Sequence, residues 1–568
     1  MQAFLESGPV PLRSGSPAQR IDAAGTNAQY LGCGNGRLSF GVAILRRMHL
    51  RLVAVAAGAS ILALSSIAAH ASAGVSDASA EPLGLYPADT FRAAARTCSG
   101  CAASPQALWY FGEDLVGVAA KSTPAPSLVW LGSSKVVDGA MLSPDRKGIV
   151  LGAAGQMPLA LVPKLPTNLS YYDASTAEFF ARRPLRLRGE MVAGPAGGES
   201  TFVARTIWPK DFTVEPGPVQ PLAETQSLQS LVRADGGGAR NPYSTRLLWS
   251  RSATPDWHGK AIVGLMLNGA QGDDDESLGG HFGVVTGEYT DGSIHHWLVN
   301  NFYGIDSISE KGIVAAVTPL DKYLMDLNSG QSYYRPSYML VAVLRSDEIP
   351  RAYQAHIDGV FDRFYRHEIE YDHANNNCSG LASDGFRALG WNIPAQGNSD
   401  KIKAIPAYAY VAAQKRSLTE GRDIYDYLTA ETTRLYPAVA FDVMGADLLA
   451  LAQHRTQRPL DEFEQKLADQ LEAIVFVRIP QIPSSRVFGS APVASFSEYR
   501  NQAPADRAKW KIVPGLPRPT MPADLRLPAV ESTRPFPVPM PVGAAALAIL
   551  GALGLVGRWC WRRVRKTS

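Results

Sequence analysis

The stretch HFGVVTGEYTDGSIHHWLVN, residues 281–300, carries the strongest local signal in the chain, and the fold around it can be worked out from there. Its two apolar runs flank Asp291-Gly292, and Asp-Gly between apolar runs is a strong signal for an antiparallel β-hairpin. Counting outward from this turn predicts that Gly283 pairs with Asn300. The hairpin therefore carries His281 at the start of its first strand, a rigid position from which an imidazole can be aimed.

The segments around the hairpin predict a sheet followed by helices. Residues 261–266 and 338–344 are continuous apolar runs of strand length, and residues 347–367 place their apolar side chains on one helical face. Residues 379–389 also have a helical pattern, and Gly390 is placed to end that helix. Cys378 is therefore predicted at the N-terminus of a helix.

Cys378 and His281 are the candidate reactive pair. A helix N-terminus lowers the pKa of a thiol, and a nearby imidazole lowers it further by taking the proton. A third polar group should orient the imidazole. The return strand offers three candidates, His296, His295 and Asn300. The predicted register places Asn300 and His296 on the face of His281 and turns His295 away, although a single bulge would reverse this.

Less specific interpretations exist for each of these residues. A lone cysteine is often a small buried hydrophobe, and histidines in strands are often satisfied polar groups. His373 lies five residues before Cys378 and competes with His281 as a base, but from a predicted loop. No two histidines share an i, i+4 helical spacing with a carboxylate, so no metal site is predicted.

The order of these motifs resembles that of a known group of enzymes. His281-Phe-Gly-Val-Val, a polar residue on the next strand, and Asn377-Cys378 opening a helix are similar to the circularly permuted papain-like fold, over residues 262–391. That group includes lecithin:retinol acyltransferase-like enzymes and permuted relatives of the NlpC-type cell-wall peptidases. The resemblance implies Cys378 as nucleophile, His281 as general base, and His296, His295 or Asn300 as the orienting residue. It also implies a thioester acyl-enzyme, transfer to water or another acceptor, no metal or organic cofactor, and cell-wall peptides or lipid acyl groups as substrates.

The N-terminal region predicts export. A basic cluster at 46–51 precedes an apolar run at 52–64 and the small-residue stretch 69–73, which is the pattern of a secretory signal peptide. We assign the signal peptide to 48–73, with Met48 as its start and 1–47 as an upstream segment outside the mature protein. An N-terminal membrane anchor is the alternative, but the apolar run is shorter than the ~20 residues of a span.

The C-terminal region predicts a membrane tether. A proline-rich stalk at 514–541 precedes an apolar run at 542–556 and five basic residues, which would stay on the cytoplasmic side. Val538-Pro-Met-Pro541 followed by this tail resembles the PEP-CTERM type of bacterial sorting signal, with Met540 where that family usually has Glu. The resemblance implies a sorting enzyme as partner, and a plain single-span anchor is the alternative.

Charge and cysteine usage narrow the class of protein further. Eleven of the 55 Lys and Arg residues lie before Ala73 or after Gly557, against two of the 52 acidic residues, so the part between is acidic. This part has no long basic stripe, which argues against nucleic acid as a partner.

Cys98 and Cys101 form a C-x-x-C that predicts a small disulfide in an oxidising compartment. A redox-active pair is the alternative, and haem attachment would need His at position 102, which is Ala.

These signals together predict an exported, membrane-tethered protein of the α+β class. Its predicted parts are a β-rich domain at 74–215, a linker at 216–241, a permuted papain-like domain at 242–400, a mostly helical extension at 401–513 with a helix at 460–474, the stalk at 514–541 and the transmembrane or sorting tail at 542–568. The predicted function is that of a cysteine hydrolase or acyltransferase that cleaves amide or ester bonds. The alternatives are a non-catalytic surface-tethered binding protein and a redox protein acting through Cys98 and Cys101.

Overall fold

The computed structural model describes three short strands at 75–77, 84–87 and 115–118, and then residues 129–502. Gaps in that description fall at 134, 165–167, 169, 272–275, 304–314, 366–368, 370, 398–400 and 486–487. The predicted signal peptide, the Cys98–Cys101 pair, the stalk and the tail lie outside the described residues. Within the described part, no helix is both long enough and apolar enough to cross a bilayer.

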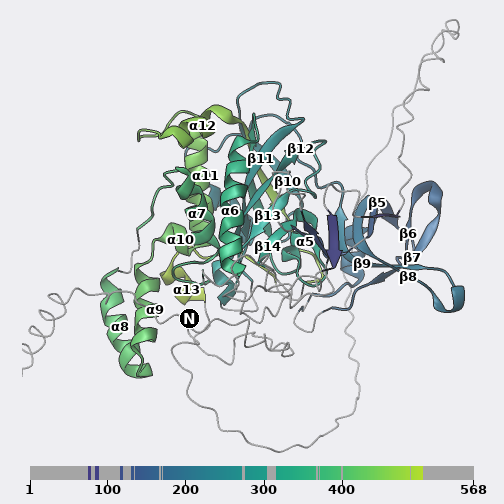
Figure 1. Cartoon of the computed structure of the whole chain (residues 1–568), viewed down its shortest axis with the longest axis horizontal. Coiled ribbons are helices and arrows are strands. Elements are labelled where there is room, and N and C mark those ends of the chain that lie inside the picture. The colour runs from purple at the N-terminus through teal and green to yellow at the C-terminus, as the bar shows by residue number, and fades with distance from the viewer. Residues whose placement is uncertain are drawn as a thin grey trace, which may run out of the picture. The chain divides into compact units, whose positions relative to one another are not determined.

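A ten-stranded sheet forms the centre of the fold, and helices accompany it, so the α+β class is confirmed (Figure 1). The strand order is β10-β16-β15-β11-β12-β13-β14-β4-β3-β2. In chain order these strands are β2 (Gly84–Pro87), β3 (Leu115–Val118), β4 (Val129–Trp130), β10 (Ser244–Ser250), β11 (Lys260–Asn268), β12 (His281–Tyr289), β13 (Leu298–Asn301), β14 (Ala316–Pro319), β15 (Ser337–Leu344) and β16 (Leu471–Ile479). All eight residues of β15 are buried, as expected of a strand that is covered on both faces.

Helices cover one face of this sheet (Figure 1). Its apolar residues pack with those of α4 (Leu228–Gly237), α6 (Glu348–Tyr365), α7 (Cys378–Leu389), α11 (Pro437–Ala452) and α12 (Glu462–Gln470). Helix α4 lies within the stretch 216–241. The other α-helices of the described part are α3 (Ala174–Phe180), α5 (Leu320–Met325), α8 (Lys401–Lys415), α9 (Leu418–Thr429), α10 (Thr432–Leu435) and α13 (Phe496–Gln502).

A second sheet packs with the opposite face. Its order is β1-β5-β6-β7-β9-β8, and an additional pairing of β5 with β8 closes the five strands β5 to β9 into a ring. The strands are β1 (Val75–Asp77), β5 (Lys135–Leu142), β6 (Gly148–Val150), β7 (Gln156–Leu161), β8 (Leu185–Val192) and β9 (Thr201–Pro209). Its buried side chains, such as Trp208, share one core with Met266 and Val285 of the ten-stranded sheet. Because both faces are covered, β11 and β15 are nearly continuous apolar runs rather than alternating ones.

Two buried carboxylates of α5 join the ring to the ten-stranded sheet. Asp321 accepts a hydrogen bond of 2.7 Å from Nε of Arg188 on β8. Asp326, the residue that ends α5, accepts one of 2.8 Å from Nε of Arg205 on β9. Buried charges are costly unless paired, so these ion pairs fix how the two sheets meet.

The helix predicted at 460–474 is too long. A capping box between Asp461 and Glu464 begins α12, but α12 ends at Gln470 and β16 follows immediately. Residues 471–474 pair with the end of β15, and β16 lies between β10 and β15. A short apolar segment can form either a helix or a strand. Here it forms a strand because it pairs with the edge of β15, which is more than 120 residues away in sequence.

The predicted register of the hairpin is wrong by one residue. Val284, not Gly283, pairs with Asn300. The connection between β12 and β13 is not a two-residue turn, because its backbone bonds elsewhere. The N–H of Val214 donates to the carbonyl of Gly292, and Thr213 forms a bridge with Ser293. This contact with a distant segment lengthens the loop and moves every later side chain to the other face.

Candidate functional site

Cys378 is the first residue of α7, and local sequence explains why the helix begins there. The side chain of Asn377 caps the helix by accepting a hydrogen bond of 2.9 Å from the N–H of Gly380. Gly390 ends it in the left-handed conformation, with φ of 106°, which glycine adopts without a steric penalty. Helix α7 packs against β12, the strand that begins with His281. Cys378 is a free, buried cysteine.

His281 lies beside the thiol and is also buried. Burial raises the pKa of the Cys378 thiol, but the charge of His281 and a hydrogen bond from it act in the opposite direction. Smaller contributions come from the backbone of Phe282 and the hydroxyl of Tyr371. The net result is a pKa lowered to about 7. A large fraction of the thiol is therefore ionised at neutral pH, as a sulfur nucleophile requires.

Asn301 holds the imidazole, and sequence reasoning missed it by one position. Nε2 of His281 is hydrogen bonded to Oδ1 of Asn301, and both residues are buried. Because Val284 pairs with Asn300, the next residue lies on the opposite face, which is the face of His281. The adjacent pair Asn300-Asn301 was the only sequence signal for this partner, and choosing between them depended on the register.

Asn300 has a different partner. Its Nδ2 donates to Oε1 of Gln354 at 3.1 Å, and Nε2 of Gln354 donates back to Oδ1 of Asn300 at 3.0 Å. Gln354 belongs to α6, so this reciprocal amide pair fastens α6 to β13. The structure therefore gives Asn300 a packing role and does not bring it to His281.

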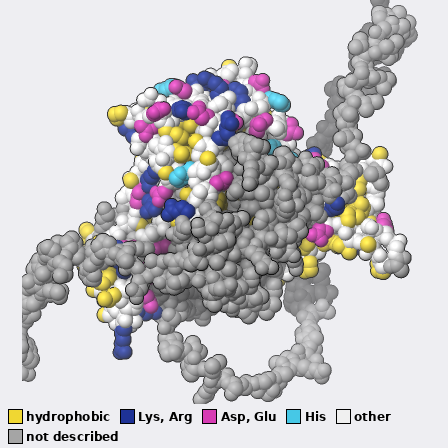
Figure 2. All heavy atoms as spheres, in the orientation of Figure 1, with side chains coloured by type: hydrophobic (Ala, Val, Ile, Leu, Met, Phe, Trp, Pro, Cys, Tyr) yellow, Lys and Arg dark blue, Asp and Glu magenta, His cyan; other side chains and the backbone are white. Residues whose placement is uncertain are grey.

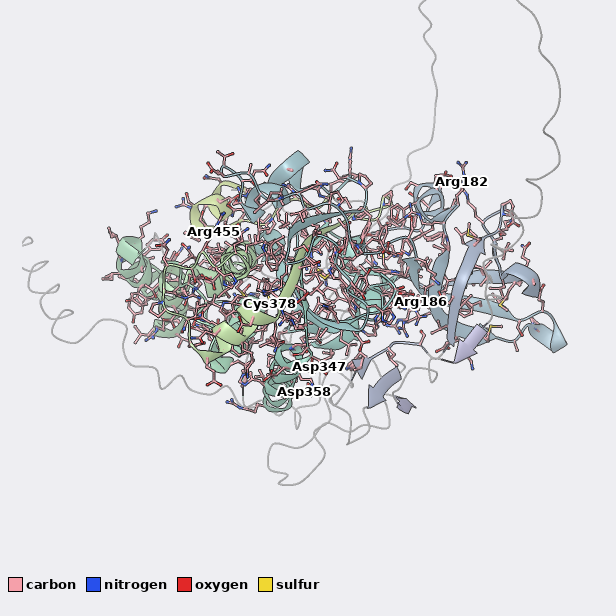
Figure 3. The ribbon with its side chains drawn as sticks, turned by 90° about the horizontal axis from the view of Figure 1, so that it is seen from above. Arg182, Arg186, Asp347, Asp358, Cys378 and Arg455 are labelled. Carbon is pink, nitrogen blue, oxygen red and sulfur yellow. The ribbon has the colours of Figure 1, made fainter. Side chains whose placement is uncertain are left out.

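His295 and His296 lie in the loop after β12, away from the thiol. Burial, and then the charge of Arg186, lower the pKa of His295 to about 3. Arg186 is well separated from Cys378 in the view from above (Figure 3). Nε2 of His296 contacts the carbonyl of Glu288 at 3.2 Å. Neither histidine is placed to orient His281.

Aromatic rings line the Cys378–His281 pair. The hydroxyl of Tyr371 accepts a hydrogen bond of 3.3 Å from the N–H of Cys378. Burial and the charge of Cys378 raise the pKa of Tyr371 well above its usual value, so the phenol keeps its proton. The ring of Tyr303 lies 6.0 Å from that of His281 and 6.2 Å from that of Tyr371. The ring of the exposed His373 is nearly perpendicular to that of Tyr371, with 5.5 Å between the two ring centroids.

Among the residues that the structure describes, no group of three or more His, Cys, Asp or Glu side chains is arranged to hold a metal ion. What the geometry provides is a sulfur nucleophile, an imidazole fixed by an amide, and a phenol beside them.

Comparison with protein-family models, with curated proteins and with solved structures gave no significant match.

Replacing Asn301 with alanine tests its role in holding His281. We expect the pKa of the Cys378 thiol to rise, because an imidazole without its amide partner stabilises the thiolate less well. The measurement is the alkylation rate of Cys378 against pH, followed by mass spectrometry of the peptide that contains it. Asn300→Ala is the matched control and should reduce stability through the lost contact with Gln354 while leaving the thiol pKa unchanged. Equal effects of the two variants on the thiol pKa would contradict the assignment.

Proposed function

We propose that this protein is a cysteine hydrolase or acyltransferase that cleaves amide or ester bonds through a thioester on Cys378. One observation carries the proposal: a buried thiol at a helix N-terminus has its pKa lowered to about 7 by a buried histidine, although burial alone would raise it. Structural cysteines in apolar surroundings show the opposite shift. Perturbed pKa values of this kind are characteristic of functional sites.

The proposed reaction has two stages. The Cys378 thiolate attacks the carbonyl carbon of the substrate, and a sulfur–carbon bond forms. The carbon–nitrogen or carbon–oxygen bond then breaks, and His281 gives its proton to the leaving amine or alcohol. Water, or another acceptor deprotonated by His281, next attacks the thioester carbonyl and releases the acyl group and the free thiol. No redox step and no cofactor is needed.

Two donors near the sulfur could stabilise the oxyanion of the tetrahedral intermediates. The backbone N–H of Cys378 points to the hydroxyl of Tyr371 in the free protein, and that hydroxyl also lies close to the thiol. Preorganised donors at this place are the usual source of transition-state stabilisation in acyl transfer. A substrate oxygen that entered between them would replace an existing hydrogen bond by one to developing charge.

The arrangement is consistent with a permuted papain-like domain. A histidine on an inner strand of a largely antiparallel sheet comes before the cysteine in the chain, and the cysteine opens a helix packed on that strand. In this proposal the ring of strands from β5 to β9 corresponds to the expected N-terminal β-rich domain, although β2, β3 and β4 of the same stretch pair in the larger sheet.

The terminal signals place this chemistry at the cell envelope in our proposal. A protein exported by its signal peptide and tethered by its tail would meet cell-wall peptides or lipid acyl groups, and a sorting enzyme would act on the tail. Nucleic acid is not part of the proposal, because the sequence between the two ends has no long basic stripe to contact phosphates. These parts of the proposal rest on the sequence alone.

An ester probe tests the chemistry without knowledge of the substrate. The full chain is incubated with p-nitrophenyl butyrate, and the peptide containing Cys378 is examined by mass spectrometry for a butyryl adduct that hydroxylamine removes. We expect the adduct in the native protein and in the Cys98→Ser/Cys101→Ser variant, and its complete absence in Cys378→Ala. Failure of the native protein to form the adduct would favour a tethered binding protein, and loss of the adduct in the Cys98→Ser/Cys101→Ser variant would favour a redox protein.

A further inference from the structure

Helices α8 and α9 form a hairpin inserted between the cysteine helix and α10. Arg416, with φ of 52°, turns the chain after α8, and Ser417 caps α9 by accepting a hydrogen bond from Glu420. The two helices pack closely, since a side chain at Gly421 would come within 2.8 Å of Cβ of Ala412. They lie side by side and project away from the sheet (Figure 1).

The base of the hairpin is fastened beside the cysteine helix. The N–H of Thr432 donates to the carbonyl of Gln396 at 3.1 Å, which brings the two ends of the insertion together. Arg434 of α10 pairs with Asp384 of α7 and donates to the carbonyl of Asn375, just before Cys378. The base of the hairpin therefore lies beside the helix that carries the thiol.

Helix α8 is apolar on two sides, but α9 covers only one of them. Ala404 and Val411 are buried in the hairpin. The opposite side presents Ile402, which is 91% exposed, and Tyr410, which is 62% exposed. The remaining members of this exposed side are Ile405, Pro406, Ala409 and Ala413. No described residue covers this second apolar side, and an uncovered apolar surface of this kind marks an interaction site.

The charges of the hairpin favour an anionic partner. Residues 401–416 contain no Asp or Glu, and Lys403 and Arg416 are exposed at its two ends. The acidic residues of α9 are less exposed, and Asp426 is paired with Arg422 at 2.7 Å. Figure 2 shows hydrophobic atoms on the outer side of the hairpin and Lys and Arg atoms at its end. Apolar residues flanked by cations are the pattern of a helix that lies in a membrane interface.

The size of the face argues against a second copy of the chain as its partner. Fifteen residues make a helix about 22 Å long and about 10 Å wide, so one side of α8 offers on the order of 200 Å². A stable dimer needs roughly 800 Å² on each partner. A bilayer surface has no such requirement, because a few inserted apolar side chains and favourable charges suffice.

We propose that the α8–α9 hairpin is a membrane-docking element, which lays the exposed face of α8 on the surface of an anionic lipid bilayer. Ile402, Ile405 and Tyr410 enter the boundary between head groups and acyl chains, and the flanking cations contact the head groups. This docking is independent of the chemistry at Cys378 and of the C-terminal tail.

A photocrosslinker on α8 tests this contact directly. Tyr410 of the full chain is replaced by p-benzoyl-phenylalanine, and the protein is irradiated with vesicles of phosphatidylglycerol and phosphatidylethanolamine. We expect a lipid adduct on the peptide that contains position 410, and a much lower yield on neutral phosphatidylcholine vesicles. The same replacement at Tyr171, an exposed tyrosine before α3, is the matched control and should give no lipid adduct. Anchoring by the tail alone would leave position 410 without lipid.

Two exposed isoleucines provide a second variant that leaves the packing of the hairpin intact. Ile402→Asp together with Ile405→Asp should lower the lipid adduct at position 410 by about tenfold, because two apolar side chains no longer enter the interface. A crosslink from position 410 to another copy, a crosslink to residues 503–568 of the same chain, or a yield equal to that at Tyr171 would each overturn the proposal. Equal yields on neutral and anionic vesicles would overturn the part assigned to the cations.

Discussion

Replacing His281 with alanine is expected to slow alkylation of Cys378 at pH 7 by at least about fifteenfold. A thiol with a pKa of about 7 is half ionised at that pH, whereas a free thiol with a pKa of ~8.5 is only about 3% ionised. The fall should be larger still, because burial remains in the variant and raises the pKa of the thiol without an opposing charge. The increase in rate with pH, centred near 7 in the native protein, should therefore move to well above 8.5.

The measurement is the rate of carbamidomethylation by iodoacetamide from pH 5 to 10, resolved for the Cys378 peptide so that other cysteines do not contribute. His296→Ala is the matched control, since the structure places His296 against Glu288, and its curve should coincide with that of the native protein. If the His281→Ala and native curves coincide instead, His281 does not set the thiol pKa, and the proposed Cys–His chemistry fails with it.

Replacing Asp321 with alanine is expected to destabilise the protein by about 3–5 kcal/mol. Asp321 is completely buried and accepts from Nε of Arg188 at 2.7 Å, and Nε of Arg186 lies 3.5 Å from the same oxygen. Removing the carboxylate leaves two guanidinium groups without their buried counter-charge at the contact between the two sheets. The measurement is urea unfolding followed by far-ultraviolet circular dichroism.

Asp211→Ala is the matched control for this loss of stability. Asp211 lies 3.5 Å from Arg183 and its side chain is 47% exposed, so the pair is solvated. Removing the Asp211 carboxylate should lower the free energy of unfolding by less than about 1 kcal/mol. If both variants lose the same stability, the buried pair has no special role in joining the sheets.

The ion pairs of Asp321 with Arg188 and Arg186 should also make the stability of the protein depend on pH. Burial raises the pKa of Asp321, but Arg188 and Arg186 outweigh it and leave the pKa below its usual value. A carboxyl group whose pKa is lower in the folded state stabilises the protein above its unfolded pKa of ~3.9, and this contribution is lost as the pH falls through the folded value. The difference in unfolding free energy between native protein and Asp321→Ala should therefore be constant at neutral pH and shrink below about pH 4.

The local parts of the site could be read from a few neighbouring residues. Asn377 and Gly390 define the beginning and end of α7, so the helical position of Cys378 follows from capping. The apolar run after His281 likewise identifies the strand that holds it, and the observed β12 begins at that histidine. These signals act within one turn of a helix or a few strand residues, and tertiary structure leaves them unchanged.

The partners across the site were decided by tertiary structure. Asn301 rather than Asn300 meets His281 because the loop after β12 bonds to residues 213 and 214, far away in sequence, and a shift of one residue turns each side chain of a strand to the other face. Tyr371 reaches Cys378 through a loop without a regular pattern, and β16 is a strand because a place beside β15 is open to it. Sequence thus determined which residues begin the elements of the site, and long-range pairing determined which of them touch, because only the folded chain sets the register between segments.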